Sequence, residues 1–101
     1  VAVGDCIYAV PCHAKQVLRI DSNSGQVDPI GPEMEGQYKY QAAVAVGDCI
    51  YAVPANAKQV LRIDTNSGQV ALIGPEMEGD YKYKAAVPVG DCIYAVPYYA
   101  K

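Results

Sequence analysis

The sequence carries two pairs of glutamates that could act as catalytic carboxylates. Glu33 and Glu35 form one pair, and Glu76 and Glu78 recur 43 residues later in the same Glu-Met-Glu-Gly context. Two carboxylic acids on either side of a glycosidic bond are the machinery of glycoside hydrolases. A pair that recurs in every unit of a tandem array indicates structure instead, and the sequence has no nucleophile elbow or glycine-rich phosphate loop. We therefore expect no catalytic residue, no enzyme activity and no cofactor.

The only histidine gives a second candidate, because Cys12 and His13 are adjacent and both residue types bind zinc. A zinc site needs four ligands at recurring spacings. The equivalent positions hold Ala55 and Asn56 in the second repeat and Tyr98 and Tyr99 in the third. The pair therefore predicts no metal site.

Asp21, Asn23 and Gly25 have the spacing that opens a calcium-binding loop, and the spacing recurs from Asp64. A loop of the EF-hand type needs a glutamate at its twelfth position, where this sequence has Pro32. Asn-Ser-Gly is typical of hairpin turns, since Asn and Gly accept the backbone angles that such turns require. We expect a turn here.

Three of the four cysteines, Cys6, Cys49 and Cys92, occupy one position of the repeat. We expect them to be small buried apolar residues inside a strand. About 20 Å of extended chain separates Cys12 from Cys6. A disulfide needs Cα atoms within about 7 Å, so these two cysteines cannot pair unless the chain bends back.

Composition excludes several classes of protein. The chain has 101 residues, a formal net charge of −3 and 51% hydrophobic residues. An acidic chain without basic patches is poorly suited to nucleic-acid phosphates. No apolar run approaches the roughly 20 residues of a membrane-spanning helix, and the chain is too apolar to be disordered. We expect no nucleic-acid or membrane partner, and the cellular location stays open.

The chain is a tandem repeat with a period of 43 residues. The expected units are 1–43, 44–86 and a partial third unit, 87–101. The first two units are identical at 36 of 43 positions. A period of this length fits propeller blades and helical repeats, but no stretch keeps a helical apolar stripe for three turns.

Each unit predicts four short antiparallel β-strands. In the order first to fourth strand of the unit, the expected strands are residues 81–89, 92–96, 59–64 and 69–73. The first of these crosses from the second unit into the third, the second lies in the third unit, and the last two lie in the second unit. They are rich in Val, Ile, Leu and Tyr and are bounded by Gly-Asp, Pro, Asn-Ser-Gly and Gly-Pro. Alternation within the first strand predicts that Tyr81 and Tyr83, like Tyr38 and Tyr40, share a face in the core between units.

Proline positions support this order of strands. Pro29 and Pro88 fall in the outer strands, where a missing N–H is tolerated. The second strand is apolar on both faces, with Cys49 and Tyr51 on one side and Ile50 on the other. A strand covered on both sides belongs to a stack of sheets.

Two motifs carry a resemblance to a known family. Gly-Asp-x-Ile-Tyr-Ala, followed by Gln-Val-Leu-Arg-Ile-Asp-x-Asn-Ser-Gly-Gln-Val, resembles the blades of NHL- and kelch-type β-propellers over the whole chain. The kelch Gly-Gly doublet and the WD dipeptide are absent. The resemblance implies four-stranded antiparallel propeller blades, here two blades and an extra hairpin. It implies no particular function, because propellers host many.

The sequence holds three copies of the hairpin made by the first and second strands of the unit, but only two copies of the hairpin made by the third and fourth strands. A closed ring needs equal numbers of both, so we expect that the array does not close on itself. It is a fragment of a longer array, a unit that several copies complete as a ring, or part of an open filament. We favour self-assembly of identical chains, because near-identical repeats make contacts within and between chains nearly equivalent.

The resembled propellers bind ligands at one rim, where the loops after the second and fourth strands meet. The candidate residues there are Cys12, His13, Asn56, Tyr98, Tyr99, Glu33, Glu35, Glu76 and Glu78. Positions 12 and 13 differ in every repeat, as on a binding surface, although unconstrained loops vary in the same way. The functions to weigh are a structural or binding module that self-assembles, a propeller lectin with one site per blade, and a designed or excised propeller fragment without a function of its own.

Overall fold

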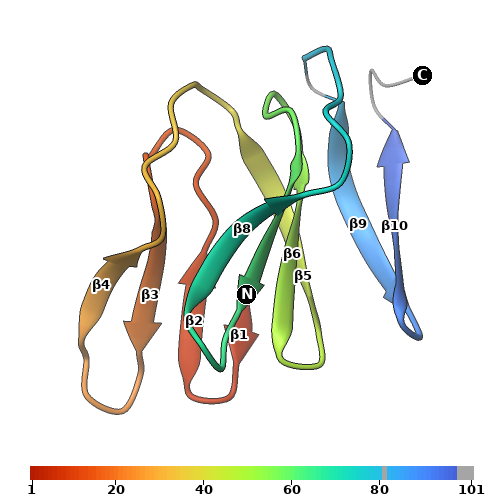
Figure 1. Cartoon of the computed structure of the whole chain (residues 1–101). Coiled ribbons are helices and arrows are strands. Elements are labelled where there is room, and N and C mark those ends of the chain that lie inside the picture. Colours follow the sequence, from red (N-terminus) through yellow and green to blue (C-terminus); the bar gives the residue numbers. More distant parts are fainter. Residues whose placement is uncertain (81, 98–101) are drawn as a thin grey trace.

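The computed structural model describes residues 1–80 and 82–97, and every regular element in these ranges is a β-strand (Figure 1). The strands are β1 (Ala2–Val3), β2 (Cys6–Ala9), β3 (Val17–Asp21), β4 (Val27–Ile30), β5 (Tyr40–Val46), β6 (Cys49–Pro54), β7 (Val60–Asp64), β8 (Gln69–Ile73), β9 (Tyr83–Val89) and β10 (Cys92–Pro97). The predicted strands are confirmed with bounds that move by two residues or fewer.

The strands form three antiparallel sheets that follow one another along the chain. Strands β1 to β4 make sheet 1, β5 to β8 make sheet 2, and β9 and β10 make sheet 3. Within each sheet the strands pair in chain order, and the first and last strands do not pair with each other, so the sheets are open. This arrangement of two four-stranded antiparallel sheets and a hairpin confirms the predicted all-β class. Pro29 lies in β4, the outer strand of sheet 1, as expected.

Glycine and asparagine set the hairpin turns. Val46 pairs with Cys49 across Gly47 and Asp48, and Gly47 has a φ of 60°. A positive φ at the first central residue is what a two-residue type II′ turn requires, and glycine adopts it without strain.

The turn predicted at Asp64 and Asn66 is also confirmed. The Asn66 backbone N–H donates to the Asp64 carboxylate at 3.0 Å, the local bond that makes Asx turns. The Asn66 side chain donates to the Asp48 carboxylate at 3.0 Å. This bond ties the β7–β8 turn to the β5–β6 turn and fixes one end of sheet 2.

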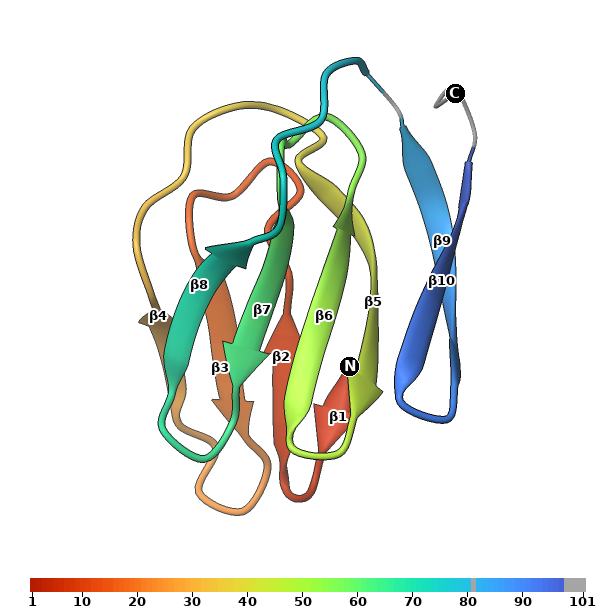
Figure 2. The same ribbon diagram turned by 45° about the vertical axis from the view of Figure 1, so that its right-hand side comes forward.

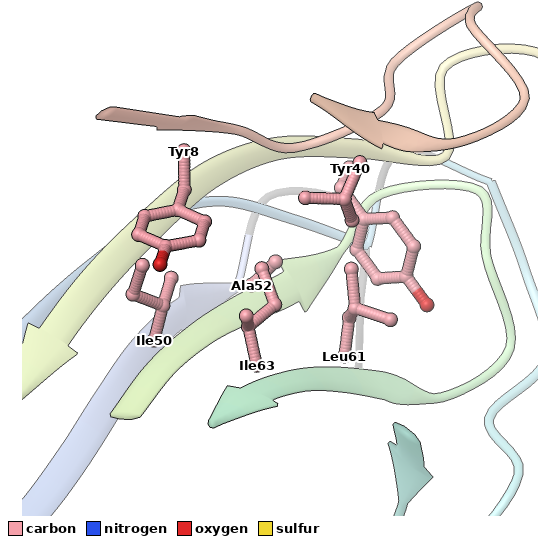
Figure 3. Close-up of a cluster of buried hydrophobic side chains, with 7 residues drawn as sticks. Tyr8, Tyr40, Ile50, Ala52, Leu61 and Ile63 are labelled. Atoms are coloured by element: carbon pink, nitrogen blue, oxygen red, sulfur yellow. The ribbon is translucent and has the colours of Figure 1, made fainter. Parts of the chain in front are cut away.

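The core lies between sheet 1 and sheet 2, which pack face to face (Figure 3). Tyr8 from β2 and Val17 from β3 face sheet 2, where Ile50 and Leu61 have no exposed surface. Full burial of such side chains contributes about 1.5–3 kcal/mol each. Packing between repeats therefore supplies the largest share of apolar burial.

Sheet 2 lies between the other two sheets (Figure 2), with β9 packed against β5 and β6. On β6, Ile50 and Ala52 are fully buried on one face. On the other face Val53 is 4% exposed, and Cys49 and Tyr51 are half-buried. The prediction that this second strand of the repeat is covered on both sides is confirmed for sheet 2.

Two expectations about side chains are wrong. Tyr38 and Tyr40 do not share a strand face, because β5 begins at Tyr40 and Tyr38 lies in the preceding loop with a φ of 51°. Tyr40 is buried in the core as predicted, whereas Tyr38 is exposed. Tyr81 lies outside the described residues.

The repeated cysteines are also not uniformly buried. Cys6 and Cys49 are half-buried free thiols, and Cys92 is exposed. In the two complete sheets an arginine reaches the sulfur: Arg19 Nη2 lies 3.2 Å from Cys6 Sγ, and Arg62 Nη2 lies 3.2 Å from Cys49 Sγ. The cysteines thus belong to a polar contact that residue type alone did not predict.

The core makes a direct stability prediction through one cross-strand pair. Leu61 on β7 and Leu72 on β8 are cross-strand partners. Leu61 is fully buried, whereas Leu72 is 48% exposed. We expect Leu61→Ala to lower the free energy of unfolding by about 2–5 kcal/mol because it leaves a cavity.

Leu72→Ala is the matched control and should change the free energy by about 0.5 kcal/mol or less. Urea unfolding followed by circular dichroism measures both values. Equal losses in the two variants would contradict the packing described.

Candidate functional site

Four loops gather at the end of the molecule opposite the hairpin turns (Figure 1). We call this end the loop rim. It consists of residues 10–16, 31–39, 55–59 and 74–80. The Met34 N–H donates to the Lys15 carbonyl at 2.6 Å, and the Met77 N–H donates to the Lys58 carbonyl at 2.7 Å. In both sheets, therefore, the loop after the fourth strand is held against the loop after the second strand.

The backbone of Lys39 joins the loops of neighbouring sheets. Its N–H donates to the Cys12 carbonyl of sheet 1 at 3.0 Å, and its carbonyl accepts from Ala55 and Ala57 of sheet 2 at 2.9 and 3.3 Å. One repeat later, the Lys82 N–H donates to the Ala55 carbonyl at 3.0 Å. The rim is therefore a hydrogen-bonded belt that runs from sheet to sheet.

The side chains of these two lysines are buried, which is unusual for lysine. Lys39 and Lys82 are each 3% exposed, and their ammonium groups donate to the carbonyls of Gly36 and Gly79 at 2.8 Å. Burial lowers the pKa of Lys82, and the neighbouring carboxylates of Asp80 and Glu78 oppose that shift. Each lysine closes the turn of its own loop.

A pocket of about 350 Å³ opens in the rim at the junction of sheets 1 and 2. Its lining residues are Met34, Glu35, Lys39, Tyr40, Asn56, Ala57, Lys58, Gln59 and Leu72. The loop before β5 supplies one wall and the loop before β7 supplies the other. The lining thus combines one carboxylate, two amides and two lysine side chains with apolar surface.

Two hydrogen bonds hold the pocket walls in place. The Tyr40 hydroxyl donates to the Gln59 carbonyl at 2.7 Å, and the Asn56 amide donates to the Gln37 carbonyl at 3.1 Å. Burial raises the pKa of Tyr40 to about 12, since the phenolate form would lose its hydration. Tyr40 therefore stays a neutral hydrogen-bond donor over the physiological range.

Of the predicted rim residues, the structure brings Glu35 and Asn56 together in this pocket. The Glu35 carboxylate lies 3.6 Å from the Lys15 ammonium, and both side chains are well exposed. Such a surface ion pair contributes little to stability. A ligand could therefore displace Lys15 from the carboxylate at small cost.

Cys12 and His13 lie beside the pocket rather than in it. The His13 Nδ1 accepts the Tyr38 backbone N–H at 3.3 Å, and the two rings meet edge to face with centroids 4.3 Å apart. Residues 1–80 and 82–97 contain no group of three or more side chains able to hold a metal ion. His13 thus holds the loop before β5, which is a positioning role.

The remaining predicted site residues are not gathered by this pocket. Glu33, Glu76 and Glu78 are exposed and do not line it. Tyr98 and Tyr99 lie outside the described residues. The two glutamates of a pair are therefore in different settings, because only Glu35 of the first pair reaches the pocket.

Sequence reasoning missed Lys39 and Gln59, which complete the pocket. A signal for Lys39 exists in the sequence: Tyr-Lys-Tyr recurs at 38–40 and 81–83, and a lysine between two aromatic residues can be buried through its alkyl chain. Gln59 gave no such signal, because its role depends on the hydroxyl of Tyr40, which comes from β5, two strands away from β7 in sheet 2.

The chain matches no protein-family model and no curated protein sequence. Among the residues that the structure describes, there is no helix long and apolar enough to cross a membrane. Any function of the chain is therefore inferred from its site and its surfaces.

The buried hydroxyl of Tyr40 makes a pH prediction. Tyr40→Phe removes the bond to Gln59, so at pH 8 it should lower the free energy of unfolding by about 1 kcal/mol. The folded-state pKa of about 12 lies above the usual value near 10. The stabilisation by Tyr40 is therefore complete below pH 10 and is lost as the pH rises toward 12.

Urea unfolding of both proteins at pH 8, 10 and 11 tests this. The stability difference between wild type and Tyr40→Phe should shrink steadily from pH 10 upward. A difference that stays constant over that range would mean that Tyr40 is not buried as a neutral phenol.

Proposed function

We propose that the chain is a structural and binding repeat module of the β-propeller type that assembles with copies of itself into a ring or a larger array, and that it catalyses no reaction. Support for propeller blades comes from the open four-stranded antiparallel sheets, from their face-to-face packing in chain order, and from the repeat motifs.

One observation carries the self-assembly: identical residues are buried between sheets and exposed at the two ends of the array. Tyr8 is 2% exposed, and its equivalent in sheet 3, Tyr94, is 59% exposed. Ile50 is fully buried, and its equivalent in sheet 1, Ile7, is 42% exposed. The end sheets therefore present to solvent the same apolar side chains that the interior buries.

Exposed apolar patches of this kind are typical of interaction surfaces in soluble proteins. Repeat units that cannot bury both faces alone gain stability by stacking on further units. In a solution of this chain the available units are other copies. The loop rim would then run around the assembly, with one pocket at each junction.

Self-assembly predicts a mass above that of one chain, 10.8 kDa. Light scattering coupled to size-exclusion chromatography should give a multiple of this mass that increases with concentration, because association of copies follows mass action. A 10.8 kDa species with a cooperative thermal transition at every concentration would contradict the proposal.

A second candidate function is carbohydrate binding at the loop rim, and the pocket between Glu35 and Asn56 favours it. Carboxylate and amide groups beside apolar surface are suited to sugar hydroxyls. The position of Asn56 is occupied by His13 in the first repeat, so different junctions would bind different ligands.

A glycan array with the wild-type chain tests this second function, with Glu35→Gln and Glu33→Gln as a matched pair. Both residues lie in one loop, but only Glu35 lines the pocket. Bound glycans should lose affinity several-fold in Glu35→Gln and keep it in Glu33→Gln. If no glycan binds at millimolar concentration, the lectin hypothesis is wrong.

A further inference from the structure

The two ends of the array carry different apolar surfaces. We call Ile7, Leu18, Ile20 and Val27 the leading face of sheet 1. Ile7 pairs with Ile20 and Ile20 with Val27, so these side chains lie on one side of the sheet. Ile7 is 42% and Val27 is 53% exposed, whereas Leu18 and Ile20 are half-buried.

Sheet 3 carries the opposite surface. We call Val87, Val89, Cys92 and Tyr94 its trailing face. Val87 pairs with Tyr94 and Val89 with Cys92, which again puts these side chains on one side of the hairpin. Val87, Val89 and Tyr94 are 52%, 62% and 59% exposed. Neither face, as defined, includes a charged side chain.

The interior of the chain shows how these two kinds of face fit together. Sheet 2 has its own equivalent of the leading face in Ile50, Leu61 and Ile63, all fully buried. The covering residue from sheet 1 is Tyr8, whose ring points toward Ile50 (Figure 3). Tyr8 is the repeat equivalent of Tyr94, so a trailing-type residue already covers a leading-type face.

We infer that the trailing face of one copy binds the leading face of a second copy, head to tail, and repeats the packing of sheet 1 on sheet 2. This inference rests on the proposed self-assembly and names its partner and its polarity. The residues that would meet are the same as those that meet inside the chain: Tyr94 takes the place of Tyr8, and Ile7 takes the place of Ile50.

The contact is heterologous, since it joins two unlike faces. Each added copy leaves one leading and one trailing face open, so the assembly closes as a ring or grows as a filament. Sheet 3 has two strands where sheet 1 has four. It therefore covers the part of the leading face nearest β2, which makes Tyr94 and Ile7 the central contact.

Two variants test the polarity. Ile7→Asp places a charge on the leading face and leaves the trailing face intact, and Tyr94→Asp does the reverse. Both positions are exposed in the single chain, so the fold should tolerate the changes. Light scattering should find each variant alone with the mass of one chain, because neither can form the unlike contact with itself.

An equimolar mixture of the two variants should contain a species of two chains and nothing larger. The open trailing face of Ile7→Asp can bind the open leading face of Tyr94→Asp once, and the blocked faces prevent growth. Tyr38→Asp is the control, since Tyr38 is an exposed aromatic residue on the loop rim with a φ that aspartate accepts. It should assemble like the wild type.

The outcomes separate the inference from the proposed function. A wild-type chain that stays monomeric overturns both. If the wild type assembles but the mixture gives no two-chain species, the head-to-tail contact is wrong and self-assembly still holds. The same follows if one variant dimerises alone. Should either aspartate variant lose its β-sheet circular dichroism spectrum, the serine variants Ile7→Ser and Tyr94→Ser replace it, with the same mixture as the deciding result.

Discussion

The structure depends on the burial of one apolar sheet face by the sheet that precedes it in the chain. No sheet here has a core of its own, because each is a single layer of short strands with apolar residues on both sides. Tyr8 and Ile50, which are 2% and 0% exposed, belong to the cluster in which this burial occurs. Every sheet needs two neighbours to bury both of its faces, and only sheet 2 has two. Sheets 1 and 3 each have one neighbour, and each therefore leaves one apolar face exposed.

The loop rim obeys the same constraint through hydrogen bonds. Lys39 lies between sheets 1 and 2, and its backbone bonds to loops of both. A pocket forms at that junction because two neighbouring sheets each contribute a wall. In the proposed assembly, a junction between two copies would bring together the same kinds of loop. This gives the variable rim residues a place where they could select a ligand while the repeated scaffold stays constant.

Much of the fold could be predicted from sequence because the residues that form turns and end strands are easy to recognise. Gly47 sets a hairpin turn, Asn66 caps the next, and proline marks strand ends and outer strands. Less of the site could be predicted. The alternation Tyr-Lys-Tyr places Tyr38 on a strand face, but the rim hydrogen bonds of Lys39 stop the strand at Tyr40 and bury the lysine instead. Repeated sequence also cannot reveal burial, since Tyr8 and Tyr94 have the same neighbours in sequence and opposite exposures.

Hydroxyl-radical footprinting of Tyr94, read by tandem mass spectrometry across a series of protein concentrations, tests most directly whether the open faces meet. Burial between copies predicts that oxidation of Tyr94 falls toward the low level of Tyr8 as the mass of the assembly rises. Tyr38, exposed on the rim, should stay reactive throughout. Oxidation of Tyr94 that stays high in the assembled protein would show that the chains associate through some other surface.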